Sequence, residues 1–237
     1  MIWLTHKWAF AVLVLASVFV MRVFIVFPQL DLAISALAYR NGHFIGEFGW
    51  AIEGLRAATW NMTLVMLVAA VIALSLGYTA RWPHRLLPIR EWNIIFWGFL
   101  LGPGLVVNGL LKSFSGRTRP KNITEFGGDQ FFTAVGQFHG LCKNNCSFVS
   151  GEVSGTTAFC LAGVILLEHH RANLSAKMLG RLYAALWACF VFVALQRITS
   201  GGHFTSDALL AALYTALVMA LLARFWPQTP EKLKLAG

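Results

Sequence analysis

Six apolar runs, each roughly 20 residues long, alternate with short polar segments along this chain of 237 residues. A helix of about 20 apolar residues crosses the roughly 30 Å hydrocarbon core of a lipid bilayer. The runs are Trp8–Phe27, Trp60–Thr79, Trp92–Leu111, Gly151–Leu167, Leu179–Gln196 and Asp207–Phe225. This pattern predicts an all-α fold, an integral membrane six-transmembrane-helix bundle that forms a single domain over residues 1–237.

The segment from Gln29 to Thr59 lies between the first two runs and is itself apolar at helical spacing. It is too short for a separate domain, so we expect one or two short interfacial helices that lie on the membrane surface. Pro28 sets the turn by which the chain leaves the first run. We expect that first run to be retained, since it exceeds the usual length of a signal peptide and no small-residue cleavage site follows it.

Composition agrees with a membrane protein, because 57% of the residues are hydrophobic and 12% are charged. Both values are far from the averages of soluble domains. Tryptophan also falls at or beside several run ends, including Trp8, Trp60 and Trp92, as aromatic side chains do at membrane interfaces. The expected partner of most of the surface is therefore the lipid bilayer.

The net charge of +9 bears on orientation. With both termini in the cytoplasm, ten of the nineteen Lys and Arg residues lie in inner segments and nine in outer ones. Setting aside four of the outer nine as candidate site residues, the positive-inside preference predicts cytoplasmic termini and a periplasmic outer face. The cations are spread over short loops, which argues against nucleic acid as a partner. Those four residues are Lys112, Arg117, Arg119 and Arg197.

Four cysteines fall into two groups. Cys160 and Cys189 lie inside apolar runs, where a thiol packs as a small hydrophobic side chain. Cys142 and Cys146 lie on the outer side, where an oxidising periplasm allows a disulfide, and the sequence leaves this pair either bridged or free. Zinc is disfavoured because the sequence offers His139 alone as a nearby third ligand, and we expect neither a metal nor a cofactor.

Candidate chemistry is concentrated in the stretch from Arg197 to Asp207. His203 and Asp207 are four residues apart, which places them on one face of the first turn of a helix. A carboxylate there can hold the imidazole in one tautomer and leave the other ring nitrogen free to attack. Arg197, before the Gly201-Gly202 turn, offers donors that match phosphate oxygens. Taken alone, the stretch is better explained by an interfacial arginine and a capped helix start.

Polar groups at other run ends fall on the same side of the membrane. Lys112 and Arg119 follow the third run, and Ser150 and Gly151 open the fourth, where free backbone amides attract an anion. A patch that binds lipid headgroups is the alternative for the three cations Lys112, Arg117 and Arg119. Ionisable residues at membrane edges are costly unless they serve a function, so their common placement favours a phosphate site.

The spacing of these residues resembles the type 2 phosphatidic acid phosphatase superfamily. The resemblance covers a motif core of residues 104–215. It implies a six-helix membrane bundle and metal-independent hydrolysis of a lipid phosphate or diphosphate through a phosphohistidine. The motifs are Lys112 followed by six residues and Arg119-Pro120, then Ser150-Gly151, then Arg197, five residues, His203, three residues and Asp207.

The resemblance also implies roles for individual residues. By position, His203 is the nucleophile and Asp207 is the residue that orients it. The implied ligands of the phosphoryl oxygens are Lys112, Arg119, Arg197, the Ser150 hydroxyl and the Gly151 amide.

Glu152 departs from the family pattern, which usually has a histidine after Ser-Gly as the acid that protonates the leaving oxygen. A carboxyl group can take that role only while it is protonated, which nearby cations oppose and desolvation favours. A good leaving group, such as a sugar 1-phosphate or a diphosphate, lessens the need for an acid. Glu152 is our candidate for the catalytic acid, and His139 is the other candidate.

The Ser-Gly-Glu variant and the Phe27-Pro28-x-Leu30-Asp31 segment resemble bacterial lipid A phosphatases. We therefore expect a hydrolase of the bacterial inner membrane that removes a phosphate from lipid A, or from a related membrane lipid, at the periplasmic face. The motifs are also compatible with an undecaprenyl diphosphate or phosphatidylglycerophosphate phosphatase, and with a lipid phosphotransferase. A lipid-binding protein whose site has decayed at Glu152 is the non-enzymatic alternative.

Overall fold

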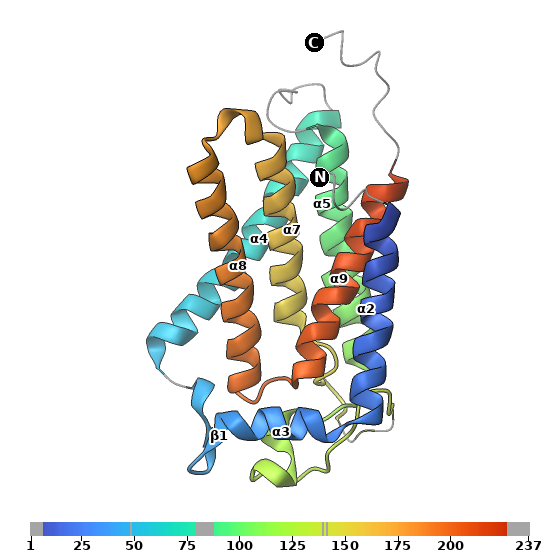
Figure 1. Ribbon diagram of the computed structural model, residues 1–237, viewed down its shortest axis with the longest axis vertical. Helices are drawn as coiled ribbons and strands as arrows, with labels where there is room; N and C mark the ends of the chain where they lie inside the picture. The colour runs from blue at the N-terminus through green and yellow to red at the C-terminus, as the bar shows by residue number, and fades with distance from the viewer. Residues whose placement is uncertain (1–6, 48, 79–87, 139, 141, 227–237) are drawn as a thin grey trace.

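Six long helices lie side by side along the long axis of the molecule in the computed structural model (Figure 1), which describes residues 7–47, 49–78, 88–138, 140 and 142–226. Each is long and apolar enough to cross a membrane, which confirms the predicted all-α membrane bundle. The helices are α2 (Lys7–Val26), α4 (Trp50–Tyr78), α5 (Ile89–Phe99) continuing through a π-helical segment (Leu100–Leu111) into α6 (Lys112–Phe114), α7 (Gly151–His169), α8 (Ala176–Thr199) and α9 (Thr205–Phe225).

Helix α4 begins ten residues earlier than the predicted second span, at Trp50 rather than Trp60. The predicted surface segment therefore ends sooner, and residues 50–59 form the first turns of a helix of 29 residues. An ion pair between Glu53 and Arg56, one turn apart and 2.8 Å long, stabilises these turns. At 1.5 Å per residue the helix is about 44 Å long, so it extends beyond the hydrocarbon core. Figure 1 shows its first turns diverging from the bundle.

A short helix, α3 (Gln29–Ala38), lies across the ends of the long helices (Figure 1), as the apolar periodicity of this segment predicts. A two-stranded hairpin follows, with β1 (Tyr39–Arg40) antiparallel to β2 (His43–Phe44). Tyr39 and Phe44 pack against Phe126 of the long loop between α6 and α7. The short 3₁₀ helices are Ile45–Glu47, Pro120–Asn122, Thr124–Phe126 and Arg171–Asn173.

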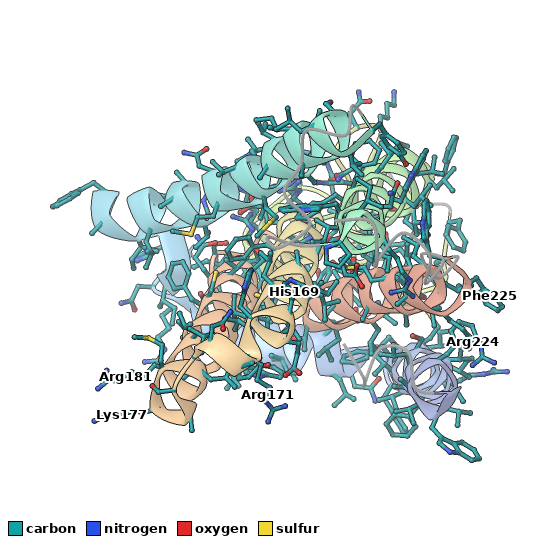
Figure 2. The ribbon with its side chains drawn as sticks, turned by 90° about the horizontal axis from the view of Figure 1, so that it is seen from above. His169, Arg171, Lys177, Arg181, Arg224 and Phe225 are labelled. Carbon is teal, nitrogen blue, oxygen red and sulfur yellow. A yellow bond between two sulfur atoms is a disulfide. The ribbon has the colours of Figure 1, made fainter. Side chains whose placement is uncertain are left out.

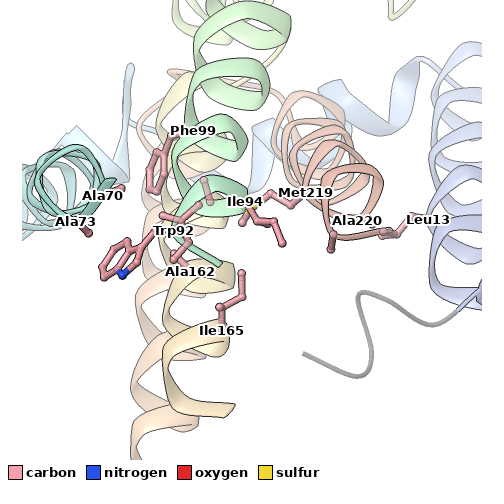
Figure 3. Packing of buried hydrophobic residues seen from close by; sticks show 13 residues of the cluster. Leu13, Ala70, Ala73, Trp92, Ile94, Phe99, Ala162, Ile165, Met219 and Ala220 are labelled. Carbon is pink, nitrogen blue, oxygen red and sulfur yellow. The ribbon is translucent and has the colours of Figure 1, made fainter. Parts of the chain in front are cut away.

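Helix α7 lies at the centre of the bundle and packs against α4, α5, α8 and α9. Small residues make this possible, since Ala158 and Ala162 are fully buried where the neighbouring helices approach. Figure 3 shows Ala162 and Ile165 beside Trp92 and Ile94 of α5 in the largest buried apolar cluster. The centre of the bundle therefore depends on the small volume of the α7 side chains.

The π-helical segment carries the third span past Pro103, whose ring removes a helical hydrogen bond. The Asn108 side chain donates to the Pro103 carbonyl at 2.7 Å. Gly102 lies close to Thr215 of α9, since a Cβ atom on Gly102 would be only 3.4 Å from the Thr215 methyl carbon. The Gly102-Pro103-Gly104 motif thus allows a close contact between the third span and α9.

The long loop between α6 and α7 contains the Cys142–Cys146 disulfide, which decides the choice that the sequence left open. Cys160 and Cys189 are free and partly buried in the helices, as predicted. His139 lies outside the described residues, as do the basic residues of segments 79–87 and 227–237. The proposed role of His139 as an acid is therefore still a prediction.

The tight packing around α7 leads to a first prediction. Replacing Ala162 with Leu adds three carbon atoms where the side chain has no exposed surface, and overpacking of this kind costs about 1–3 kcal/mol. We expect a lower thermal unfolding midpoint for the purified protein in detergent. The matched control is Ala184→Leu on the exposed face of α8, which should leave the midpoint unchanged. Equal midpoints for both variants would contradict the packing argument.

Candidate active site

The polar groups predicted from the sequence to form a site meet at the end of the bundle that carries α3 and the loop between α6 and α7 (Figure 1). Lys112 lies near the end of the third span, Arg197 lies in the last turn of α8, and His203 lies in the turn before α9. The backbone amide of Ser150 donates to the carbonyl of Asp207 at 3.2 Å, which joins the start of α7 to the start of α9. Four segments distant in sequence therefore share one site.

The His203 imidazole is 2% exposed, and the backbone fixes its orientation. Its Nδ1 lies 2.7 Å from the carbonyl oxygen of Ser147. A carbonyl oxygen only accepts hydrogen bonds, so this contact assigns the proton to Nδ1 and leaves the lone pair on Nε2. The Asp207 carboxylate is 3.9 Å from Nδ1, too far for a hydrogen bond. The direct orienting partner is therefore the Ser147 carbonyl rather than the carboxylate expected from the sequence.

Asp207 contributes to the orientation of His203 indirectly, through Ser147. One carboxylate oxygen accepts from the Ser147 hydroxyl at 2.5 Å and from the Phe204 amide at 3.0 Å. The second bond caps the start of α9. The Ser147 amide in turn donates to the Arg117 carbonyl at 2.8 Å. Asp207 thus fixes both the segment that holds His203 and the helix that follows it.

Arg117 occupies the centre of this end of the molecule with 1% of its surface exposed. Its guanidinium donates to Asp207 at 2.5 Å and to Asp31 of α3 at 2.8 Å. A further donor reaches the Thr133 carbonyl at 2.9 Å, and the group lies over the Phe204 ring at 4.4 Å. Arg117 belongs to the basic group that the sequence indicates, but it binds carboxylates of the fold.

Asp31 is a residue that the sequence reasoning did not assign to the site. It is fully buried, and its carboxylate accepts from the amide of Ser206 at 3.0 Å and from the hydroxyl of Ser206 at 2.5 Å. The surface helix α3 is therefore joined directly to the first turn of α9. The signal in the sequence was an acidic residue in an otherwise apolar interfacial helix. Burying such a carboxylate without a partner is costly, so its presence points to a partner.

Arg197 reaches the site because of the two glycines that follow it. Gly201 has a φ of +62°, which glycine adopts without strain. A Cβ atom on Gly202 would lie 2.1 Å from an Arg197 guanidinium nitrogen, so any larger residue would displace that side chain. The Gly201-Gly202 turn thus returns the chain to α9 while it leaves space for the guanidinium.

Arg119 is held by the disulfide-containing loop. Its Nε and Nη2 atoms donate to the Asn145 carbonyl at 3.2 and 2.9 Å. Burial lowers the pKa of Arg119 below its usual value, and the positive charge of Arg197 lowers it further. The cations of the site therefore repel one another, which a bound anion would relieve.

These cations also act on His203. Burial lowers the pKa of His203 well below its ordinary value, and the charges of Arg119, Arg197 and Lys112 add to that effect. The neutral imidazole is consequently the form present at neutral pH. A neutral ring with its lone pair on Nε2 beside three cations has the state that nucleophilic attack on a phosphate requires.

Ser150 and Gly151 begin α7 at this site, as predicted. The Ser150 hydroxyl accepts from the Val153 amide at 3.4 Å as the N-cap of the helix, and its own hydrogen is available to a second acceptor. A Cβ atom on Gly151 would lie 2.8 Å from the Asn108 side-chain oxygen. Glycine at this position therefore allows the helix start to approach the third span.

Glu152 lies in a charged network that includes a residue of α4. Its carboxylate pairs with Arg56 at 2.9 Å and approaches Arg197 at 3.7 Å. Arg56 also pairs with Glu53, whose carboxylate accepts from Gln196 at 3.4 Å. Arg56 was not predicted, because the sequence placed it in a surface segment rather than in a helix beside the site. Glu152 therefore contacts a phosphate-binding candidate directly.

The buried pairing of Arg117 leads to a second prediction. Arg117→Met removes the cation shared by Asp31 and Asp207 and leaves two buried carboxylates without their guanidinium partner. Breaking a buried pair costs about 3–5 kcal/mol, so we expect a clearly lower thermal midpoint in detergent. Lys177→Met, at an exposed position of α8, is the matched control. An Arg117→Met protein as stable as this control would show that the cluster contributes little to folding.

Comparison with known proteins agrees with this geometry. Residues 92–230, more than half of the chain, match the PAP2 superfamily. The chain is 29% identical to a lipid A 4'-phosphatase of Rhizobium leguminosarum over 85% of its own length and 89% of that protein. It is 28% identical to a lipid A 4'-phosphatase of Francisella tularensis subsp. novicida, over 85% and 90% of the two chains.

The fold is also similar to that of a solved structure, the crystal structure of the first transmembrane PAP2 type phosphatidylglycerolphosphate phosphatase from Bacillus subtilis. The TM-score is 0.59 at 18% sequence identity, and the match covers 90% of this chain and 93% of the other. At this identity the likeness concerns the fold alone. The family match over more than half of the sequence therefore shows that the chain belongs to the PAP2 superfamily and is a membrane-embedded phosphatase.

Proposed function

We propose that this protein hydrolyses a phosphate from lipid A at the periplasmic face of a bacterial inner membrane, through a phosphohistidine at His203. The observation that carries the proposal is the state of His203, whose Nδ1 is bonded to the Ser147 carbonyl while its pKa is lowered by burial and by three cations. The relatives named lipid A 4'-phosphatase support the choice of substrate. The proposed ligands of the phosphate are Lys112, Arg119, Arg197, the Ser150 hydroxyl and the Gly151 amide.

The reaction has two steps in this proposal. In the first, Nε2 of His203 attacks phosphorus in line with the bond to the lipid oxygen; that bond breaks, and the oxygen leaves with a proton from an acid. In the second, water attacks the phosphohistidine and gives a proton to the conjugate base of that acid. The phosphorus–nitrogen bond breaks, inorganic phosphate is released, and neutral His203 is restored. Phosphoryl transfer needs mainly positioning and charge stabilisation, which fixed guanidinium and ammonium groups supply. The structure describes no cluster of three His, Cys, Asp or Glu residues that could hold a metal ion within its placed segments.

Glu152 is the proposed acid of the first step. Its carboxylate pairs with Arg56 and approaches Arg197. A substrate phosphate that binds Arg197 would therefore lie close to this carboxyl group, where a proton must be given to the leaving oxygen.

The proposed orientation follows from the charges at the two ends of the bundle. Figure 2 shows the end opposite the site, where Arg171, Lys177, Arg181 and Arg224 are labelled, and all four are exposed. The positive-inside preference places such residues in the cytoplasm. The site end, with its disulfide, then faces the periplasm, where disulfides persist.

The test of substrate and nucleophile uses purified full-length protein in detergent with a chelator present. Lipid A, undecaprenyl diphosphate and phosphatidylglycerophosphate are offered side by side, and released phosphate is measured. We expect lipid A to have the highest kcat/KM, and His203→Ala to lower phosphate release by on the order of 10⁴-fold or more. His169→Ala, an exposed histidine at the opposite end (Figure 2), should retain wild-type activity.

Each outcome of that experiment bears on a different part of the proposal. Preference for another lipid would reject lipid A as substrate and leave the nucleophile assigned. Full activity of His203→Ala would reject the phosphohistidine. Phosphate transfer that needs an added lipid alcohol would indicate a phosphotransferase, and no release from any lipid would favour a binding protein.

Glu152 is tested with leaving groups of different quality. Glu152→Gln should lower kcat on lipid A by about 10²- to 10⁴-fold, the usual value of general acid catalysis. On p-nitrophenyl phosphate, whose leaving group needs no proton, the same variant should be close to wild type. Glu125→Gln, at an exposed position of the loop, is the control. Equal losses on both substrates would instead make Glu152 a residue that positions Arg197.

A further inference from the structure

A polar cleft of about 440 Å³ lies next to the proposed phosphate site. One wall is the chain from Thr118 to Asn122, and the other is the disulfide loop. Its volume falls within the roughly 300–1,000 Å³ of small-molecule sites. The lining residues are Thr118, Arg119, Lys121, Asn122, Gln130, Cys142, Lys143, Asn144 and Asn145.

The walls of this cleft are fixed to each other and to the core. The Cys142 amide donates to the Gly116 carbonyl at 3.1 Å, and the disulfide closes the loop on Cys146. On the other side, the Thr118 hydroxyl donates to the Gln130 side chain at 3.1 Å. The backbone amide of Gln130 also donates to the backbone carbonyl of Asn122 at 3.0 Å. A cleft with walls bonded in this way keeps its shape before a ligand binds.

Two observations place the cleft beside the catalytic residues. Arg119 lines it and is also one of the cations that act on His203. The amide of Lys121 donates at 3.1 Å to the carbonyl of Gly201, in the turn that precedes His203. A substrate whose phosphate binds Arg119 would therefore have the cleft directly next to that phosphate.

The side chains that line the cleft match some lipid headgroups better than others. Amide side chains such as those of Asn122 and Asn144 both donate and accept hydrogen bonds, which suits the hydroxyl and amide groups of an amino sugar. Lys121 and Lys143 add positive charge at the exposed rim, which suits a second phosphate. By contrast, the groove among α4, α7 and α8 is lined by residues such as Leu55, Phe159 and Phe192. Sugar and phosphate thus match the cleft, and acyl chains match the groove.

We propose that this cleft binds the phosphorylated amino-sugar headgroup of the substrate beyond the phosphate that is removed. The inference rests on lipid A as the proposed substrate and names the part of the protein that recognises it. A lipid whose phosphate is attached to a simple alcohol would leave the cleft unfilled. Apart from Thr118 and Arg119, the lining residues of the cleft lie outside the three family motifs, so the cleft is a determinant of specificity that the motifs do not describe.

The test compares substrates with and without the sugar, in full-length protein. In the double variant Lys143→Ala with Asn144→Ala, we expect the KM for bisphosphorylated lipid A to rise about tenfold with kcat little changed. The reason is that the lost contacts weaken binding of the substrate and of the transition state by the same amount. Kinetics on p-nitrophenyl phosphate, which has no sugar, should stay at wild-type values. The matched control is Asn173→Ala with Lys177→Ala, two exposed residues at the opposite end.

A charge reversal tests the second phosphate separately. Lys143→Glu should raise the KM for bisphosphorylated lipid A more than the KM for lipid A that carries only the phosphate to be removed. An unchanged KM for lipid A in the double variant, or equal losses on lipid A and p-nitrophenyl phosphate, would overturn the proposal. If the wild-type protein hydrolyses p-nitrophenyl phosphate but not lipid A, the proposed substrate is wrong and the headgroup inference falls with it.

Discussion

The pairing of one buried guanidinium with two buried carboxylates is the constraint on which the site depends. Arg117 bonds to Asp31 of α3 and Asp207 of α9, so one side chain joins a surface helix, a loop and a membrane span. Each group is costly to bury alone, and together they satisfy one another. The position of Ser147, and with it the orientation of His203, follows from this cluster.

Outside this cluster, the site is rich in positive charge. Lys112, Arg119 and Arg197 act together on His203, and Glu152 offsets only part of their charge. The protein thus keeps its paired charges under the site and its excess positive charge where a phosphate would bind. Such an arrangement is preorganised for an anion, because the cations are held by the fold before the anion arrives.

Much of this could be predicted from the sequence, and the failures have physical causes. Apolar runs indicated six spans, since membrane helices must bury nearly every residue in lipid or protein. The order of the spans predicted that Lys112 and His203 lie at the same end of the bundle. The start of α4 was missed because polar residues such as Arg56 resemble a surface segment, and the roles of Asp31 and Arg117 depend on contacts between segments more than 80 residues apart.

The divergence of α4 has a consequence for how substrate is found. Its first turns leave the bundle at the site end (Figure 1), where Trp50 is 91% exposed, and an apolar groove opens between α4 and α8. A lipid that keeps its chains in such a groove stays in the membrane while it approaches the site. Encounter then becomes a search in two dimensions, governed by the surface density of the lipid in the membrane rather than by its concentration in bulk solution.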